Sequence, residues 1–116
     1  MAPIQYVEVV ERLAGLALGY RGERVDFCWR PYERRPADHR RDYDRLVASI
    51  RAQGIQRPLI TFGRHVLIGM RRAEIGLALG LETARCWRIL EDVHDWHGSD
   101  IARLNALKAR CGAADY

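Results

Sequence analysis

The stretch from His65 to Gly80 constrains this chain most, because a short apolar strand there runs directly into a glycine and an arginine-bearing helix. Gly69 lets the backbone approach a ligand closely, and the first N–H groups of the following helix have no intrahelical partners. The helix dipole also favours negative charge at that end. The sequence therefore predicts an anion-binding junction, where Arg71 and Arg72 add guanidinium donors suited to phosphate.

The residues before this junction predict a helix followed by a hairpin. From Asp42 to Gly54, apolar residues recur at spacings of three and four, and the glycine is a natural left-handed residue after a helix. Gly63-Arg64 separates the apolar runs 57–62 and 65–68. Two residues with glycine first favour a tight hairpin of the II′ kind.

The residues after the junction predict a helix, a strand and a second helix. The first helix is expected to bury three residues on one side, Ile75, Ala78 and Leu79. It should end at Gly80, and Thr83–Leu90 should form a strand. Ser99 is a good N-cap for the last helix, which should run to about Arg110.

The N-terminal part predicts a further helix and strand. Apolar residues from Ile4 to Leu18 are spaced by three and four, so we expect an amphipathic helix that extends the core, with a specific partner-binding role as the alternative. Arg24–Trp29 alternates like a half-buried strand, and Pro31–Pro36 interrupts regular structure. We expect one mixed α/β (α+β) domain over residues 1–116, with a helical N-terminal extension at 1–35, a core at about 43–90 and a C-terminal helix at about 99–111.

The composition fits a globular protein with an anionic partner. The 116 residues are 48% hydrophobic and 29% charged, with a net charge of +4, and Lys108 is the only lysine. An arginine-rich chain suits phosphate recognition, but a GC-rich genome also produces this bias, so the prediction relies on where the arginines are placed. The three cysteines, Cys28, Cys86 and Cys111, are too few and scattered for a disulfide framework. With neither a signal peptide nor an apolar membrane span, a cytoplasmic location is expected.

A second group of arginines lies in a stretch that also contains Trp29, Tyr32 and Tyr43. On a loop, such a stretch could contact a nucleic-acid backbone and stack on bases. These arginines are Arg30, Arg34, Arg35, Arg40 and Arg41. The alternative is a solvated loop in which they pair with the nearby acidic residues.

One cluster of potential metal ligands is not expected to bind a metal. Asp92, His94, Asp95 and His97 lie close together, but a His-x-x-His pair without a fixed third ligand is common in surface loops. We therefore predict no metal site.

Three features in sequence order resemble the ParB/sulfiredoxin superfamily. Leu46–Ile50 with Gly54–Pro58 resembles its L-x-x-S-I-x-x-x-G-x-x-x-P box, the hairpin Leu59–Ile68 follows, and Gly69-Met-Arg-Arg72 resembles the ParB G-E-R-R phosphate box. The resemblance covers about Tyr43 to Ile89. It implies CTP or another nucleotide with Mg²⁺ as ligand, bound by Gln56, Arg57, Gly69, Arg71 and Arg72.

The sequence also departs from the family pattern. Met70 stands where ParB has glutamate and where sulfiredoxin has its reactive cysteine, so the chain is not expected to be a sulfiredoxin. After Ile89 there is no match to the ParB E-N-x-x-R motif; Asp100–Arg103 and Leu104-Asn105 are only loose substitutes. We therefore expect a stand-alone ParB N-terminal-like domain of the kind found in phages and mobile elements.

Two functions follow from these observations. The first is a nucleotide- or nucleic-acid-binding module that grips phosphate at the junction, where any enzymatic activity would be slow CTPase-like triphosphate hydrolysis. The second is a degenerate ParB-like fold that acts as a protein-interaction or regulatory module without nucleotide; a homodimer is one form that a protein partner could take. For the first, we expect Arg72 to be the more enclosed arginine and the main phosphate donor, because Gly76 leaves room above it, with Arg71 more exposed and supporting.

Overall fold

One mixed sheet organises the molecule, with its strands in the order β1-β5-β3-β4-β2. The computed structural model describes residues 3–18, 36–91 and 99–111. The strands are β1 (Tyr6–Arg12), β2 (Ala17–Leu18), β3 (Leu59–Phe62), β4 (His65–Ile68) and β5 (Thr83–Ile89). The helices are α1 (Pro36–Gln53), α2 (Met70–Ala78) and α3 (Ser99–Arg110), with a short 3₁₀ turn, η1, at Leu13–Gly15.

The sheet combines antiparallel and parallel pairs. β5 lies between β1 and β3; it is antiparallel to β1 and parallel to β3. The hairpin pairs β3 with β4 antiparallel, and β2 adds to β4 in parallel. Strands β1 and β2 therefore form opposite edges although η1 connects them within a few residues.

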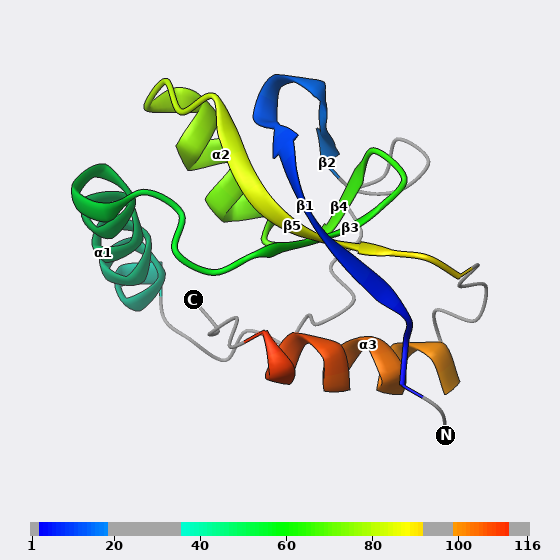
Figure 1. The fold of residues 1–116 in the computed structure, drawn as a ribbon. Helices are drawn as coiled ribbons and strands as arrows, with labels where there is room; N and C mark the ends of the chain where they lie inside the picture. The colour runs from blue at the N-terminus through cyan, green and yellow to red at the C-terminus, as the bar shows by residue number, and fades with distance from the viewer. Residues whose placement is uncertain (1–2, 19–35, 92–98, 112–116) are drawn as a thin grey trace.

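This short connection requires a curled sheet. Five residue steps from Arg12 to Ala17 span at most about 18 Å, whereas four strand spacings across a flat sheet amount to about 19 Å. Leu13 N donates to Glu82 O and Ala17 N donates to Arg64 O, so both ends of the connection are tied to the sheet. Figure 1 shows β1 and β2 joined by a single turn at one end of the sheet.

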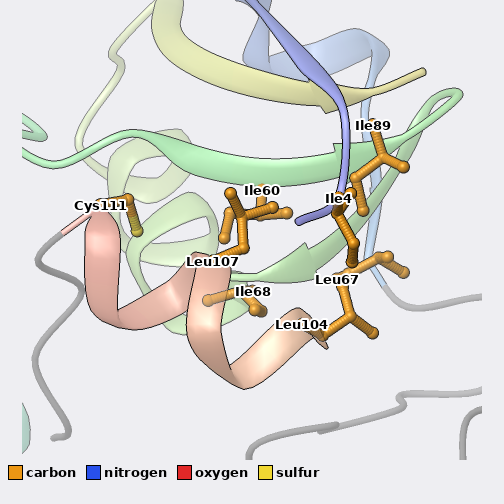
Figure 2. Close-up of a cluster of buried hydrophobic side chains, with 8 residues drawn as sticks. All are labelled: Ile4, Ile60, Leu67, Ile68, Ile89, Leu104, Leu107 and Cys111. Atoms are coloured by element: carbon orange, nitrogen blue, oxygen red, sulfur yellow. The ribbon is translucent and has the colours of Figure 1, made fainter. Parts of the chain in front are cut away.

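The two faces of the sheet carry separate parts of the core. Leu59 and Ile60 are consecutive and fully buried, yet they belong to different clusters, as alternation along a strand requires. The cluster with Ile60 packs between the sheet and α3, as Figure 2 shows. Its members are Ile4, Ile60, Leu67, Ile68, Ile89, Leu104, Leu107 and Cys111. The cluster with Leu59 includes Ala73 of α2, and Ile75 on the same helix packs against Leu46 and Ile50 of α1.

The predicted mixed α+β fold is confirmed, and so are most of its elements. Helix α1 ends before Gly54, which has φ +75°, and the hairpin turns at Gly63, which has φ +59°. Primed hairpin turns need a positive φ at this first turn position. Strand β5 and helix α3 begin at the predicted residues, Thr83 and Ser99.

The predicted N-terminal helix is wrong, because residues 6–12 form β1. A spacing of three and four places apolar side chains on one face of a helix but on both faces of a strand. Here Tyr6 packs against the cluster between the sheet and α3, and Val9 packs against the cluster that includes Leu59 and Ala73 of α2. Pairing with all seven residues of β5 supplies the backbone hydrogen bonds, and valines favour such a pleated surface. The strand predicted at Arg24–Trp29 lies outside the described residues.

One detail of α2 was also predicted wrongly. Ala78 is exposed and Leu79 is half-buried, whereas Arg72, Ala73, Ile75 and Gly76 are buried. At 100° per residue, a buried stripe through Arg72, Gly76 and Leu79 leaves Ala78 on the outer side. Among the described helices, none has the length and apolar character needed to cross a membrane.

Candidate phosphate-binding site

The junction between β4 and α2 depends on the geometry of Gly69. This residue has φ +97° and ψ +21°, a left-handed conformation that turns the chain from the strand into the helix. A Cβ atom here would lie 2.6 Å from Leu59 Cδ2 and 3.0 Å from Arg72 Nη2. Gly69 is thus needed both for its backbone angle and for the space it leaves. No side chain caps the helix at this position, so the first-turn N–H groups keep their capacity for an anion.

Arg72 is enclosed beside Gly69. Its side chain is 5% exposed, and its guanidinium lies over the glycine rather than over the next helical turn. Side chains on a helix point toward its N-terminus, so this direction is the expected one. Arg72 Nη1 donates to Arg57 O at 3.0 Å and thereby connects the junction to the segment before β3.

The greater enclosure predicted for Arg72 is confirmed, but the reason given for it was wrong. A Cβ on Gly76 would meet Ile55 Cδ1 at 2.9 Å and Leu13 Cδ1 at 3.2 Å, with no atom of Arg72 within its three nearest neighbours. Gly76 therefore makes room for apolar side chains that pack on α2. The glycine that accommodates Arg72 is Gly69.

Arg71 has a different environment from its neighbour. The side chain is half-buried, and its Nη1 is shielded from solvent without a hydrogen-bond partner among the described residues. A guanidinium nitrogen in this state has lost water and gained nothing in return, which is unfavourable. An anion that reached this nitrogen would supply the missing acceptor.

The segment Gly54–Pro58 is held by two arginines from different elements. Arg85 of β5 donates to Gln56 O, and Arg72 of α2 donates to Arg57 O. The side chains of Gln56 and Arg57 are exposed. The five residues predicted to bind the nucleotide thus lie on two segments that Arg72 connects. Gln56 and Arg57 lie on the first, and Gly69, Arg71 and Arg72 lie on the second.

Arg85 was not predicted as a site residue from the sequence, because only the long-range strand register places it near the junction. In the parallel register of β3 and β5, Leu59 pairs with Cys86, so Arg85 comes beside the start of β3. Cys86 is fully buried and Arg85 is exposed, as alternation requires. The site therefore combines arginines from β5, from α2 and from the segment before β3.

Met70 occupies the remaining position of the junction. Its side chain is half-buried and packs against the cluster of Leu59, Val66 and Ala73. A thioether in apolar packing offers neither a carboxylate for Mg²⁺ nor a thiolate nucleophile.

Arg40 and Arg41 lie on α1 rather than on the predicted loop. The Arg40 side chain is 80% exposed and pairs with Asp44 at 3.3 Å, one helical turn away. This pairing agrees with the solvated alternative for Arg40. Arg30, Arg34 and Arg35 lie outside the described residues, as do the potential metal ligands Asp92, His94, Asp95 and His97. Within the described ranges, no group of three or more metal-ligand side chains occurs.

Arg103 and Asp100, the loose substitutes for the missing motif, hold the N-terminal segment. Arg103 pairs with Glu91 and, at 3.2 Å, with Asp100, and its Nη2 donates to Pro3 O at 3.4 Å. Gln5 N donates to Glu91 Oε2 at 3.0 Å. The hydrogen bond from Gln5 lowers the pKa of the Glu91 carboxyl, and Arg103 lowers it further. These contacts stabilise the docking of α3.

Comparisons with known proteins support the architecture. A scan against protein-family models finds no match, and a sequence search of curated proteins finds none either. A search of solved structures finds a Pnob8-like ParB-N domain with a TM-score of 0.63 and 19% sequence identity. The match covers 98% of this chain. The chain has a ParB-N-like fold.

The match extends the likeness beyond the sequence motifs. The motifs cover only about residues 43–89, whereas the structural match includes the N-terminal strand β1, where the sequence pattern predicts a helix. This chain spans 40% of the length of the matched chain. At this level of identity the likeness concerns the fold, so the function of the junction must be argued from its own residues.

Proposed function

We propose that the β4–α2 junction binds the phosphate groups of a nucleotide. The observation that carries the proposal is the buried, unpartnered Nη1 of Arg71 at the first turn of a helix whose N-cap is the left-handed Gly69. A phosphate there would accept hydrogen bonds from backbone N–H groups and from the guanidinium together. The ParB-N-like fold and the motif resemblance favour CTP, with Mg²⁺, as the first nucleotide to test.

A compact nucleotide fits these features better than an extended nucleic acid. The arginines of the site surround one helix N-terminus and one short segment, Gly54–Pro58. On α1, the charge of Arg40 is offset by its ion pair with Asp44. Binding of DNA at this site should therefore be weak, with little sequence preference and a strong dependence on salt.

The two arginines of the junction have separate roles under this proposal. Arg72 positions the site, because it connects α2 to Arg57 O and fills the space beside Gly69. Arg71 is the primary phosphate donor, since its Nη1 gains an acceptor only when the anion is present. This assignment reverses the roles expected from the sequence, and it rests on which guanidinium nitrogen is already used within the fold.

Calorimetric titration and thermal unfolding test the proposal together. CTP, ATP and GTP are titrated with Mg²⁺ into the wild type, Arg71→Ala and Arg72→Ala. Arg71→Ala should weaken binding by about ten- to a hundredfold, the loss of a charge-assisted contact of about 1.5–3 kcal/mol, and should leave the melting temperature unchanged or higher. Arg72→Ala should weaken binding and also lower the melting temperature, because Arg57 O loses its donor.

Arg64→Ala is the matched control. Arg64 lies at the opposite end of β4, where its Nε donates to Gly15 O in an exposed contact, and its removal changes the net charge equally. It should bind nucleotide as the wild type does. Equal binding by all four proteins, or no binding by the wild type, would refute the phosphate site.

The interaction module is the alternative that a specific observation favours. Met70 fills the acidic position of the ParB box with an apolar side chain packed on the core. Absence of binding to every nucleotide tested, with retained folding, is the result that this alternative requires.

A further inference from the structure

Strand β1 forms an edge of the sheet and presents apolar side chains to solvent. It is seven residues long, and its outer side pairs with no strand in the described part of the chain. Val10 is 66% exposed and Val7 is 39% exposed. Long edge strands with exposed apolar residues are open to pairing with another strand, and folded proteins usually protect such edges with charges, prolines or bulges. The seven pairs between β1 and β5 run in register without a bulge.

The backbone groups that face outward can be assigned from the pairing with β5. Leu90 N donates to Gln5 O, and Leu13 N donates to Glu82 O. Each donor lies opposite its acceptor when the register of β1 and β5 is extended by one pair at each end. In an antiparallel pair, hydrogen-bonded positions alternate with positions whose N–H and C=O point away. The odd-numbered residues of β1 therefore bond to β5. The even-numbered residues Glu8, Val10 and Arg12 direct their N–H and C=O groups to the open edge.

We propose that β1 pairs antiparallel with β1 of a second copy of this chain, about a two-fold axis at Val10. In this register Val10 lies opposite its own copy, and Glu8 of each chain lies opposite Arg12 of the other. All three positions have outward backbone groups, so the pairing forms hydrogen bonds at each of them. The two copies of Val10 cover each other, and two opposite-charge pairs flank them.

Charge complementarity selects both the second copy as partner and the register. Moving the axis to Glu8 would place two glutamates opposite each other, which is unfavourable. Moving it to Val9 would place Glu8 opposite Val10 and leave Arg12 opposite Tyr6, so both ion pairs would be lost. Glu8 and Arg12 are exposed, and one oxygen of Glu8 accepts a hydrogen bond from Trp87 Nε1 at 3.1 Å, which orients the carboxylate within the sheet.

The ends of β1 limit the pairing to this central part. After Arg12 the chain leaves the strand for η1, whose Leu13 is fully buried, so the edge ends there. Figure 1 shows the chain turning at this end toward β2. The resulting contact is a small two-fold interface that continues the sheet from one copy into the next. An interface of this size is expected to give a weak dimer that depends on concentration.

Sedimentation velocity over a wide concentration range tests the dimer with four variants. Arg12→Glu and Glu8→Arg should each weaken dimerisation by about tenfold, because two attractive pairs become repulsive. The double variant Glu8→Arg with Arg12→Glu restores both pairs in reverse order and should recover dimerisation. Val10→Pro should abolish the dimer without unfolding the chain, since the N–H that it removes points away from β5.

Circular dichroism checks that each variant is folded, and the charge swap carries the test if Val10→Pro is not. A wild type that remains monomeric at all concentrations would overturn the proposal. So would a dimer that the single charge reversals leave unchanged, or a double variant that is no better than either single one. The last result would place Glu8 and Arg12 outside a common interface.

Discussion

Replacement of Gly69 by alanine tests the structure of the junction most directly. Two costs apply at this position. A side chain at φ +97° raises the energy of the backbone by about 1–2 kcal/mol. The new Cβ would also lie 2.6 Å from Leu59 Cδ2 and 3.0 Å from Arg72 Nη2. Leu59 is fully buried, so it cannot move freely, and crowding of a packed core adds about 1–3 kcal/mol.

The combined loss of unfolding free energy should therefore be about 2–5 kcal/mol, a large part of the stability of an ordinary domain. Urea unfolding followed by circular dichroism measures it from the transition midpoint, at an unchanged slope. Gly80→Ala is the matched control, because Gly80 has φ +82° but nothing within 4 Å of the added Cβ. It should show the backbone cost alone, about 1–2 kcal/mol.

A double-mutant cycle separates the crowding from other effects. In a Leu59→Ala background, the nearest obstacle to the new methyl group is gone, so Gly69→Ala should cost less than it does in the wild type. Equal losses for Gly69→Ala and Gly80→Ala would refute the crowding argument. An unchanged cost in the Leu59→Ala background would show that Leu59 is not the obstacle.

Three further predictions concern sites outside the junction. The pKa of Glu91 lies below its ordinary value of 4.5, so its ionised form stabilises the fold above that pH, and this contribution is lost as pH falls through the folded pKa. In urea unfolding at neutral pH, Glu91→Gln should therefore be less stable than the wild type, and the difference should vanish in acid. A difference that grows in acid would contradict this. Burial raises the pKa of the Cys86 thiol to about 11, so at pH 8 this thiol should resist alkylation in the folded protein until denaturant is added. Mass spectrometry of the peptide that contains Cys86 measures the labelling, and rapid labelling of the native protein would be the contrary result. Gly76→Ala should lower the unfolding free energy by less than Gly69→Ala does, because Gly76 lies within a helix and better helix propensity offsets part of the contact of the new Cβ with Ile55 and Leu13. A loss as large as that of Gly69→Ala would show that these two side chains cannot move.

The elements that the sequence predicted correctly carry their signals locally. The left-handed glycine at Gly54 and the two-residue turn at Gly63 specify their conformations within a few residues. The junction at Gly69 belongs to the same class, since an apolar strand precedes the glycine directly and a helical pattern follows it. These features therefore needed no knowledge of distant contacts.

The N-terminal strand was missed because its stability comes from a distant partner. Val7, Val9 and Val10 have strand propensity, but the spacing of the apolar residues also fits a helix. The seven pairs with β5 decide between the two, and β5 lies more than seventy residues further along the chain. Only the long-range pairing shows that both faces of this segment are covered.

The roles of Arg71 and Arg72 illustrate the same limit within the site. Helical spacing correctly placed Arg72 on the buried side, but it compared each arginine only with residues that follow it on α2. The decisive neighbours precede the helix: Gly69 leaves the space, and Arg57 O takes the hydrogen bond. The Arg72 guanidinium, which already donates within the fold, stabilises the structure of the site, whereas Nη1 of Arg71 still lacks an acceptor. Binding and stability should therefore separate between these two adjacent residues, and that separation distinguishes a phosphate site from a fold that merely retains its arginines.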